Sequence, residues 1–68
     1  MQITLKALRV NKGLTQEKTA KDLDVSVETW ANYENGKTFP DVPMIKKIEN
    51  YFNVKYENIN FSYLNKTV

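Results

Sequence analysis

Residues 13–37 read GLTQEKTAKDLDVSVETWANYENGK, and the spacing of their apolar side chains predicts two short helices joined by a tight turn. Thr15 offers a side-chain oxygen that can cap the first helix, and Ser26 offers one for a second helix over residues 27–35. Gly36 is placed as the left-handed residue that ends the second helix. Two short helices with such a short connection have the spacing of a helix-turn-helix, although other small helical proteins share it.

The helix over residues 27–35 has two different faces. At about 100° per residue, Trp30, Tyr33 and Glu34 share one side, which we expect to face the core. The opposite side and the amino-terminal end carry short polar and apolar groups of the kind that read base edges in DNA. Asn can bond adenine, Glu can accept from cytosine, and Val or a Thr methyl can touch thymine. From the residues alone, this face fits either DNA recognition or a plain solvated surface.

The flanking sequence predicts further short helices. We expect one over residues 3–12 and another that begins at the cap Asp41, with Pro43 in its first turn. Residues 56–59 can form a last helical turn, and the tail over residues 61–68 fits a strand, a docked coil or a dimer contact. The predicted core consists of Leu5, Leu8, Leu14, Ala20, Leu23, Val25, Trp30, Tyr33, Ile45, Ile48 and Phe52.

Length and composition exclude several classes of protein. The chain of 68 residues and 7.9 kDa is the size of one small domain. It has no Cys and no His, which excludes disulfides, Cys-based zinc sites and His-dependent catalysis, so we expect no metal, no cofactor and no enzyme activity. The net charge of +2 permits an anionic partner without demanding one. No apolar stretch approaches the roughly 18 residues of a membrane helix, so we expect a cytoplasmic protein that does not bind membranes.

An ordered set of residues carries a resemblance to a known family. The set is Leu8-Arg9, Gly13-Leu14-Thr15-Gln16, Ala20 with Leu23, Val25-Ser26, Trp30, Tyr33-Glu34-Asn35-Gly36-Lys37, Pro40, and Ile45 with Ile48. Over about residues 5–59 the chain resembles the lambda-repressor-like (Cro-like, XRE-type) helix-turn-helix family. The resemblance implies an all-α, five-helix DNA-binding domain over residues 1–60, followed by a short tail over residues 61–68. It also implies a third helix laid in the major groove of a palindromic operator, with the protein bound as a two-fold dimer.

The resemblance implies roles for individual residues. Those at base-reading positions are Val27, Glu28, Thr29 and Asn32. Those at positions that contact the DNA backbone are Gln16, Asn35, Lys37 and Thr38. The ion pair of the family, which joins the first helix to the third, corresponds to Arg9 and Glu34. Candidate dimer contacts, which could alternatively fold back onto the first helix as core, are Tyr56, Ile59, Phe61, Tyr63 and Leu64.

Some positions depart from the family pattern. Asp24 stands in the turn where the family often has Gly, and Asp tolerates the left-handed conformation better than most residues. Trp30 stands where the family usually has an aliphatic residue. Glu28 is the most consequential departure, because phosphates repel a carboxylate at the groove floor unless it meets a cytosine amino group. Glu28 therefore predicts selective recognition, or alternatively an ion pair with a nearby Lys that reads no base.

These observations favour a sequence-specific transcriptional regulator, expected to be a repressor of prokaryotic, phage or mobile-element origin that binds double-stranded DNA as a homodimer. The short chain leaves no room for a sensory domain, so we expect no small-molecule ligand. The alternative is an antitoxin-like or adaptor module that uses the same fold to bind a protein, which the low net charge and Glu28 favour slightly. Against it stand Gln16, Asn35 and Lys37 together at backbone-contact positions, which an adaptor does not need.

Overall fold

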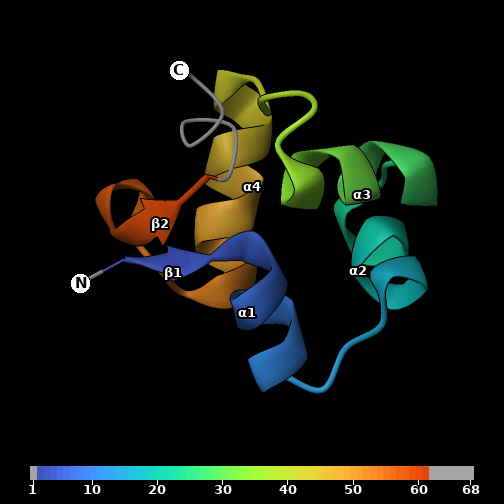
Figure 1. Cartoon of the computed structure of the whole chain (residues 1–68), viewed down its shortest axis with the longest axis horizontal. Coiled ribbons are helices and arrows are strands. Elements are labelled where there is room, and N and C mark those ends of the chain that lie inside the picture. Colours follow the sequence, from blue (N-terminus) through green and yellow to red (C-terminus); the bar gives the residue numbers. More distant parts are fainter. Residues whose placement is uncertain (1, 62–68) are drawn as a thin grey trace.

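The computed structural model describes residues 2–61, which form four α-helices, one 3-10 turn and a pair of two-residue strands (Figure 1). No helix in this part of the chain is long and apolar enough to cross a membrane. In chain order the elements are β1 (Ile3–Thr4), α1 (Leu5–Asn11), α2 (Gln16–Leu23), α3 (Val27–Asn35), α4 (Val42–Phe52), η1 (Tyr56–Asn58) and β2 (Ile59–Asn60).

Each α-helix begins at a residue whose side-chain oxygen accepts a hydrogen bond from the backbone amide three residues later. This arrangement satisfies one of the amides that a helix leaves unpaired at its start, and each such cap stabilises the helix by about 1 kcal/mol. The four capping residues are Thr4, Thr15, Ser26 and Asp41. The helix starts predicted at Thr15, Ser26 and Asp41 are therefore confirmed.

Three helices end at a residue with left-handed backbone conformation. The φ angles are 63° at Asp24, 75° at Gly36 and 53° at Asn53. Asp24 makes the turn between α2 and α3, so the prediction that Asp serves there in place of Gly is confirmed. Gly36 is both left-handed and buried, which excludes most side chains at that position. Of these three residues, Asp24 is the one in the short connection between α2 and α3.

Trp30 lies at the centre of the hydrophobic core. Its side chain is fully buried, and its ring lies 6.2 Å from that of Phe52 and meets that of Tyr33 edge-on at 6.0 Å. The other buried apolar residues come from α1, α2 and α4, from β2 and from the residue after it: Leu5, Ala20, Leu23, Met44, Ile48, Phe52, Ile59 and Phe61.

Some predicted core residues are less buried than we expected. Leu8, Leu14, Val25 and Tyr33 are half-buried and pack against the core from its edge. Ile45 is also half-buried, but it lines a surface groove, so its assignment to the core interior is corrected. It lies beside the inner face of α4, which is formed at four-residue spacing by Met44, Ile48 and Phe52.

The prediction of a mostly helical domain with a helix-turn-helix is confirmed, but the expected five helices are four, and the chain differs from the prediction in two places. Residues 3–4 are strand β1 rather than the start of the first helix, because Ile3 pairs with Ile59 and Thr4 with Asn60 in a short parallel ladder. The expected fifth helix is a single 3-10 turn, η1, because the chain must become extended at Ile59 to reach β1. The ladder joins the two ends of the described chain (Figure 1).

The structure also corrects part of the predicted dimer contact. Ile59 and Phe61 are each only 2% exposed and belong to the core, so neither is available to a second molecule. For these two residues, the structure therefore matches the alternative prediction, in which the segment folds back as part of the core. Tyr56 remains exposed, at 45%. Tyr63 and Leu64 lie outside the described residues.

A polar cluster links α2 to α4. The Tyr51 hydroxyl donates to Asp22 Oδ2 at 2.6 Å, and Lys18 Nζ lies 3.2 Å from Asp22 Oδ1. The hydrogen bond from Tyr51, followed by the contacts with Lys18, lowers the pKa of the Asp22 carboxyl below its ordinary value. Burial, followed by the contact with Asp22, raises the pKa of the Tyr51 hydroxyl.

Ile59 in β2 and Phe61 directly after it are buried, so we expect both side chains to stabilise the single chain. We expect Ile59→Val to lower the free energy of unfolding by about 0.5–1.5 kcal/mol, because it removes one buried methyl group. Phe61→Ala should cost about 3–5 kcal/mol, enough to unfold most of a domain this small. Urea unfolding followed by Trp30 fluorescence measures both, with Val10→Ala, at an exposed position, as a nearly neutral control. If these residues were dimer contacts instead, the losses would disappear in dilute protein.

The Asp22 cluster predicts a pH dependence of stability. Because the folded state lowers this pKa, the ionised carboxylate adds stability above its unfolded pKa of about 4, and that stability is lost as the pH falls through the folded pKa. We expect Tyr51→Phe to raise the Asp22 pKa towards 3.8, and the difference in Tm between parent and variant to shrink below about pH 4. NMR titration measures the pKa, and Tyr56→Phe serves as the control. An Asp22 that titrates identically in parent and Tyr51→Phe would contradict the role of the hydrogen bond.

Candidate nucleic-acid interface

The amino-terminal end of α3 presents the predicted base-reading side chains to solvent. Val27 is 38% exposed and Glu28 is exposed, whereas Thr29 and Asn32 are half-buried. Val27 and Glu28 occupy the first two positions of α3, where the capping residue Ser26 fixes the direction of the helix. The end of the helix therefore offers one apolar group, one carboxylate, one hydroxyl and one amide within two turns.

The hydroxyl of Thr29 is held in a defined position. Ser26 Oγ accepts from the Thr29 amide at 3.0 Å and donates to Thr29 Oγ1 at 2.9 Å. Because Thr29 Oγ1 accepts this bond, its own proton is free to point outward. Thr29 can therefore donate to a phosphate oxygen or to an acceptor on a base edge.

The residues predicted to contact the DNA backbone follow directly after α3. The backbone oxygen of Asn32 accepts from the Lys37 amide at 2.9 Å and from the Thr38 amide at 3.5 Å. These bonds fold the turn back on the last part of α3. The side chains of Asn35, Lys37 and Thr38 are exposed, and the bonds to Asn32 set Lys37 and Thr38 at a fixed position relative to the helix.

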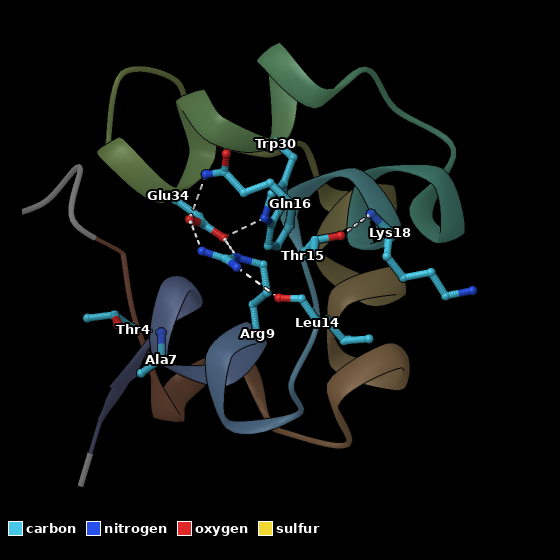
Figure 2. A network of polar contacts seen from close by, with 9 residues as sticks. All are labelled: Thr4, Ala7, Arg9, Leu14, Thr15, Gln16, Lys18, Trp30 and Glu34. Atoms are coloured by element: carbon cyan, nitrogen blue, oxygen red, sulfur yellow. Dashed lines mark hydrogen bonds and ion pairs between the residues drawn. The ribbon is translucent and has the colours of Figure 1, made fainter.

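One buried carboxylate, that of Glu34, gathers side chains from α1, α2 and α3 (Figure 2). Arg9 donates from Nε to Oε2 at 2.6 Å and from Nη2 to Oε1 at 3.3 Å. Gln16 Nε2 donates to Oε1 at 3.1 Å, and Trp30 Nε1 donates to Oε2 at 2.5 Å. Arg9 also donates from Nη1 to the backbone oxygen of Leu14 at 2.8 Å, which holds the loop before α2. The side chain of Glu34 is only 3% exposed and that of Arg9 is 12% exposed.

The structure places Gln16 between this network and solvent. It is the first residue of α2, and its half-buried side chain is anchored on Glu34. A primary amide has two N–H donors, so one bond to Glu34 leaves the second N–H available for a phosphate. Glu34 therefore fixes the orientation of the Gln16 side-chain amide.

Sequence reasoning missed the polar partners of Trp30 and Gln16. The sequence predicts Trp30 as a core residue, and the structure shows that its indole N–H also donates a buried hydrogen bond to Glu34. A signal was present, because residues four apart share one helix face and a buried indole N–H needs an acceptor. No comparable local signal marked Gln16, which lies 18 positions from Glu34.

Glu28 forms no ion pair with another residue of the described chain. Within residues 2–61, the ion pairs are Arg9 with Glu34 and Lys18 with Asp22, so Glu28 has no Lys partner. The reading in which Glu28 is neutralised by a neighbouring Lys therefore has no support in the geometry. The same part of the chain contains no group of three acidic side chains that could hold a metal ion.

The buried network predicts a stability effect of Arg9 that is separate from any effect on a ligand. We expect Arg9→Ala to lower the free energy of unfolding by about 3–5 kcal/mol, because Glu34 would keep a buried charge without its main partner. Arg9→Lys should recover only part of this loss, since Lys cannot form the two-pronged contact with the carboxylate. Urea denaturation measures these effects, and Lys12→Ala is a control at an exposed position. An Arg9→Ala protein that melts like the parent but no longer binds DNA would contradict the structural role.

Comparison with known proteins gives a consistent family assignment. A family model described as a helix-turn-helix domain matches residues 3–66. An HTH-type transcriptional regulator of Methanocaldococcus jannaschii is 42% identical over 59 residues, which cover 87% of this chain and 89% of the relative. A regulator of the same description from Archaeoglobus fulgidus is 37% identical over 59 residues, covering 87% and 83% of the two chains.

A longer protein, the HTH-type transcriptional activator BcrR of Enterococcus faecalis, is 36% identical over 55 residues. The matched region is 81% of this chain and only 27% of the activator. No solved structure gave a significant match. Since the family model and the archaeal relatives cover most of the chain, the chain belongs to the XRE-like helix-turn-helix family.

Proposed function

We propose that this protein is a sequence-specific DNA-binding transcription regulator that lays α3 in the major groove. The observation that carries the proposal is the difference between the buried inner face of α3 and its exposed first residues. Its inner residues Trp30 and Glu34 are buried and hydrogen-bonded, while its first residues are exposed. A helix held from behind in this way can enter a groove without losing its own packing.

Direct reading of bases falls to the exposed start of α3. Glu28 accepts from the exocyclic amine of a cytosine, and Asn32 offers an amide that can bond adenine on two atoms. Val27 and the methyl group of Thr29 can contact a thymine methyl. Because Glu28 has no cationic neighbour within hydrogen-bonding distance, only the correct base compensates its repulsion by the phosphates. We therefore expect strong discrimination and weak non-specific binding.

Contacts with the DNA backbone set the register of α3 in the groove. Gln16 contacts a phosphate through the N–H that Glu34 does not use, together with the backbone amides at the start of α2. Asn35, Lys37 and Thr38 contact phosphates from the turn after α3. These contacts give binding that weakens as salt rises.

A single domain of this type makes a small interface with DNA. One such module buries about 600–1,000 Å² of protein surface, which gives modest affinity. Two copies related by a two-fold axis would bind two half-sites about one helical turn apart, so the operator is palindromic. Two copies bound in this way would act as a repressor, by occluding a promoter.

Selection of bound duplexes from a randomised pool tests this function. We expect a palindromic consensus that contains cytosine opposite Glu28, with a linear fall in log affinity as log salt increases. Glu28→Gln should reduce discrimination at that base pair by about 1–3 kcal/mol and should strengthen non-specific binding. Glu57→Gln makes the same change of charge at an exposed position in η1 and should alter neither property.

The opposite result would point to the protein-binding alternative. A pool that shows no enrichment, together with weak binding that does not depend on salt, would exclude a regulator that reads DNA. An enriched consensus that Glu28→Gln leaves unchanged would keep DNA binding but remove Glu28 from the reading residues.

A further inference from the structure

The two oxygens of the buried Glu34 carboxylate receive different hydrogen bonds (Figure 2). Oε2 accepts the two shorter ones, from Arg9 Nε at 2.6 Å and from Trp30 Nε1 at 2.5 Å. Oε1 accepts the two longer ones, from Gln16 Nε2 at 3.1 Å and from Arg9 Nη2 at 3.3 Å. One oxygen is therefore held by the interior of the domain, and the other faces the half-buried side chain of Gln16.

The indole N–H of Trp30 is a donor with a fixed position. The ring is fully buried and packs against the rings of Phe52 and Tyr33, so it has no room to turn. An indole nitrogen can only donate, and residues 30 and 34 share one face of α3, which places the donor directly beside the carboxylate. Trp30 is therefore a rigid reference point for the Glu34 carboxylate.

Arg9 alone leaves the orientation of this carboxylate incompletely defined. Its bond from Nη2 to Oε1 is long, so Arg9 binds mainly to Oε2. A carboxylate that is held mainly at one oxygen can turn about that contact and move its second oxygen. The short bond from Trp30 to the same oxygen comes from a different helix and removes this freedom. Oε1 is then presented to Gln16 in one direction.

We propose that the indole N–H of Trp30 is a positioning group for the contact of Gln16 with a DNA phosphate. Trp30 acts through Glu34, because it fixes the carboxylate that holds one N–H of the Gln16 amide. The second N–H of that amide is thereby aimed at a phosphate oxygen. This inference rests on the proposed function and adds that a residue buried too deeply to touch DNA controls one of its backbone contacts.

The mobility of the Gln16 side chain in the free protein tests the positioning without DNA. We expect NMR relaxation to show an ordered Gln16 amide in the parent and a mobile one in Trp30→Phe, which removes the N–H and keeps an aromatic ring. The exposed amide of Gln2, which donates to the backbone oxygen of Glu57, is the internal reference and should not change. A Gln16 amide that is equally ordered in both proteins would overturn the proposal.

A second variant separates the lost donor from the lost ring volume. Chemical synthesis of the chain with benzothienylalanine in place of Trp30 exchanges the N–H for sulfur and keeps the two fused rings. We expect this protein to behave like Trp30→Phe in every measurement, whereas Tyr33→Phe, which changes the neighbouring ring but no donor to Glu34, should behave like the parent. Thermal unfolding verifies that each protein is folded. An effect of Trp30→Phe that the benzothienylalanine protein does not share would assign it to packing and overturn the proposal.

Duplexes that carry a single uncharged methylphosphonate test the phosphate contact itself. At the phosphate that Gln16 contacts, the replacement should weaken binding of the parent by about tenfold or more, because a hydrogen bond to a charged group is lost. Gln16→Ala and Trp30→Phe should lose little there, since both already lack the contact. At a phosphate contacted by Lys37, all three proteins should lose affinity equally, because that contact does not depend on Glu34. Equal sensitivity of the parent and Trp30→Phe at the Gln16 phosphate would overturn the proposal.

The outcomes distinguish this inference from the proposed function. A parent that binds no duplex would reject the function, and with it the phosphate contact, while the mobility of the Gln16 amide still decides whether Trp30 positions it. A parent that binds DNA, with the methylphosphonate effect abolished by Gln16→Ala and retained in Trp30→Phe, would support the function and overturn the inference. Loss of the effect in both variants, together with a mobile Gln16 amide in Trp30→Phe, would support both.

Discussion

The geometry of the whole domain depends on the burial of one carboxylate, that of Glu34. An isolated charge in the interior costs several kcal/mol, and here hydrogen bonds from Arg9, Gln16 and Trp30 offset that cost. These donors belong to α1, α2 and α3, so the network is satisfied only when the three helices have their native arrangement (Figure 2). A buried ion pair of this kind adds little net stability compared with an apolar core. Its main consequence is that α2 and α3 are held at one angle.

That constraint explains how a domain with so small a core can present a defined recognition surface. The inner side of α3 carries Trp30, whose ring touches Phe52 and Tyr33 and whose N–H binds Glu34. The exposed residues at the start of α3 do not belong to the core, so their side chains are free to contact another molecule. Gln16 belongs to both sides, because one N–H completes the buried network and the other faces outward. The proposed contact of Gln16 with a phosphate would therefore be coupled to the packing of α3.

Features fixed by near neighbours could be predicted from the residues themselves, whereas of the features that join distant residues only the Arg9–Glu34 ion pair was expected, and that through the family resemblance. The caps Thr15, Ser26 and Asp41 and the left-handed ends at Asp24 and Gly36 each depend on a few adjacent residues. The pairing of residues 3–4 with residues 59–60 has no local signal, because two residues in each strand show no alternation of side chains. The same limit applies to Ile59 and Phe61, whose apolar character fits a core and a dimer contact equally. For the candidate site, helical periodicity separated the inner from the outer face of α3, whereas the link from Gln16 to Glu34 required the tertiary structure.

The low net charge of the chain limits how the proposed regulator could gain affinity for DNA. A net charge of +2 gives only a weak general attraction to DNA, and an unpaired Glu28 at the start of the recognition helix reduces it further. In the proposed function, such a domain would not obtain its affinity from the phosphates alone and would depend on correct base contacts and on a second copy on the same duplex. Because a short helix offers few base contacts, the second copy would make the larger contribution.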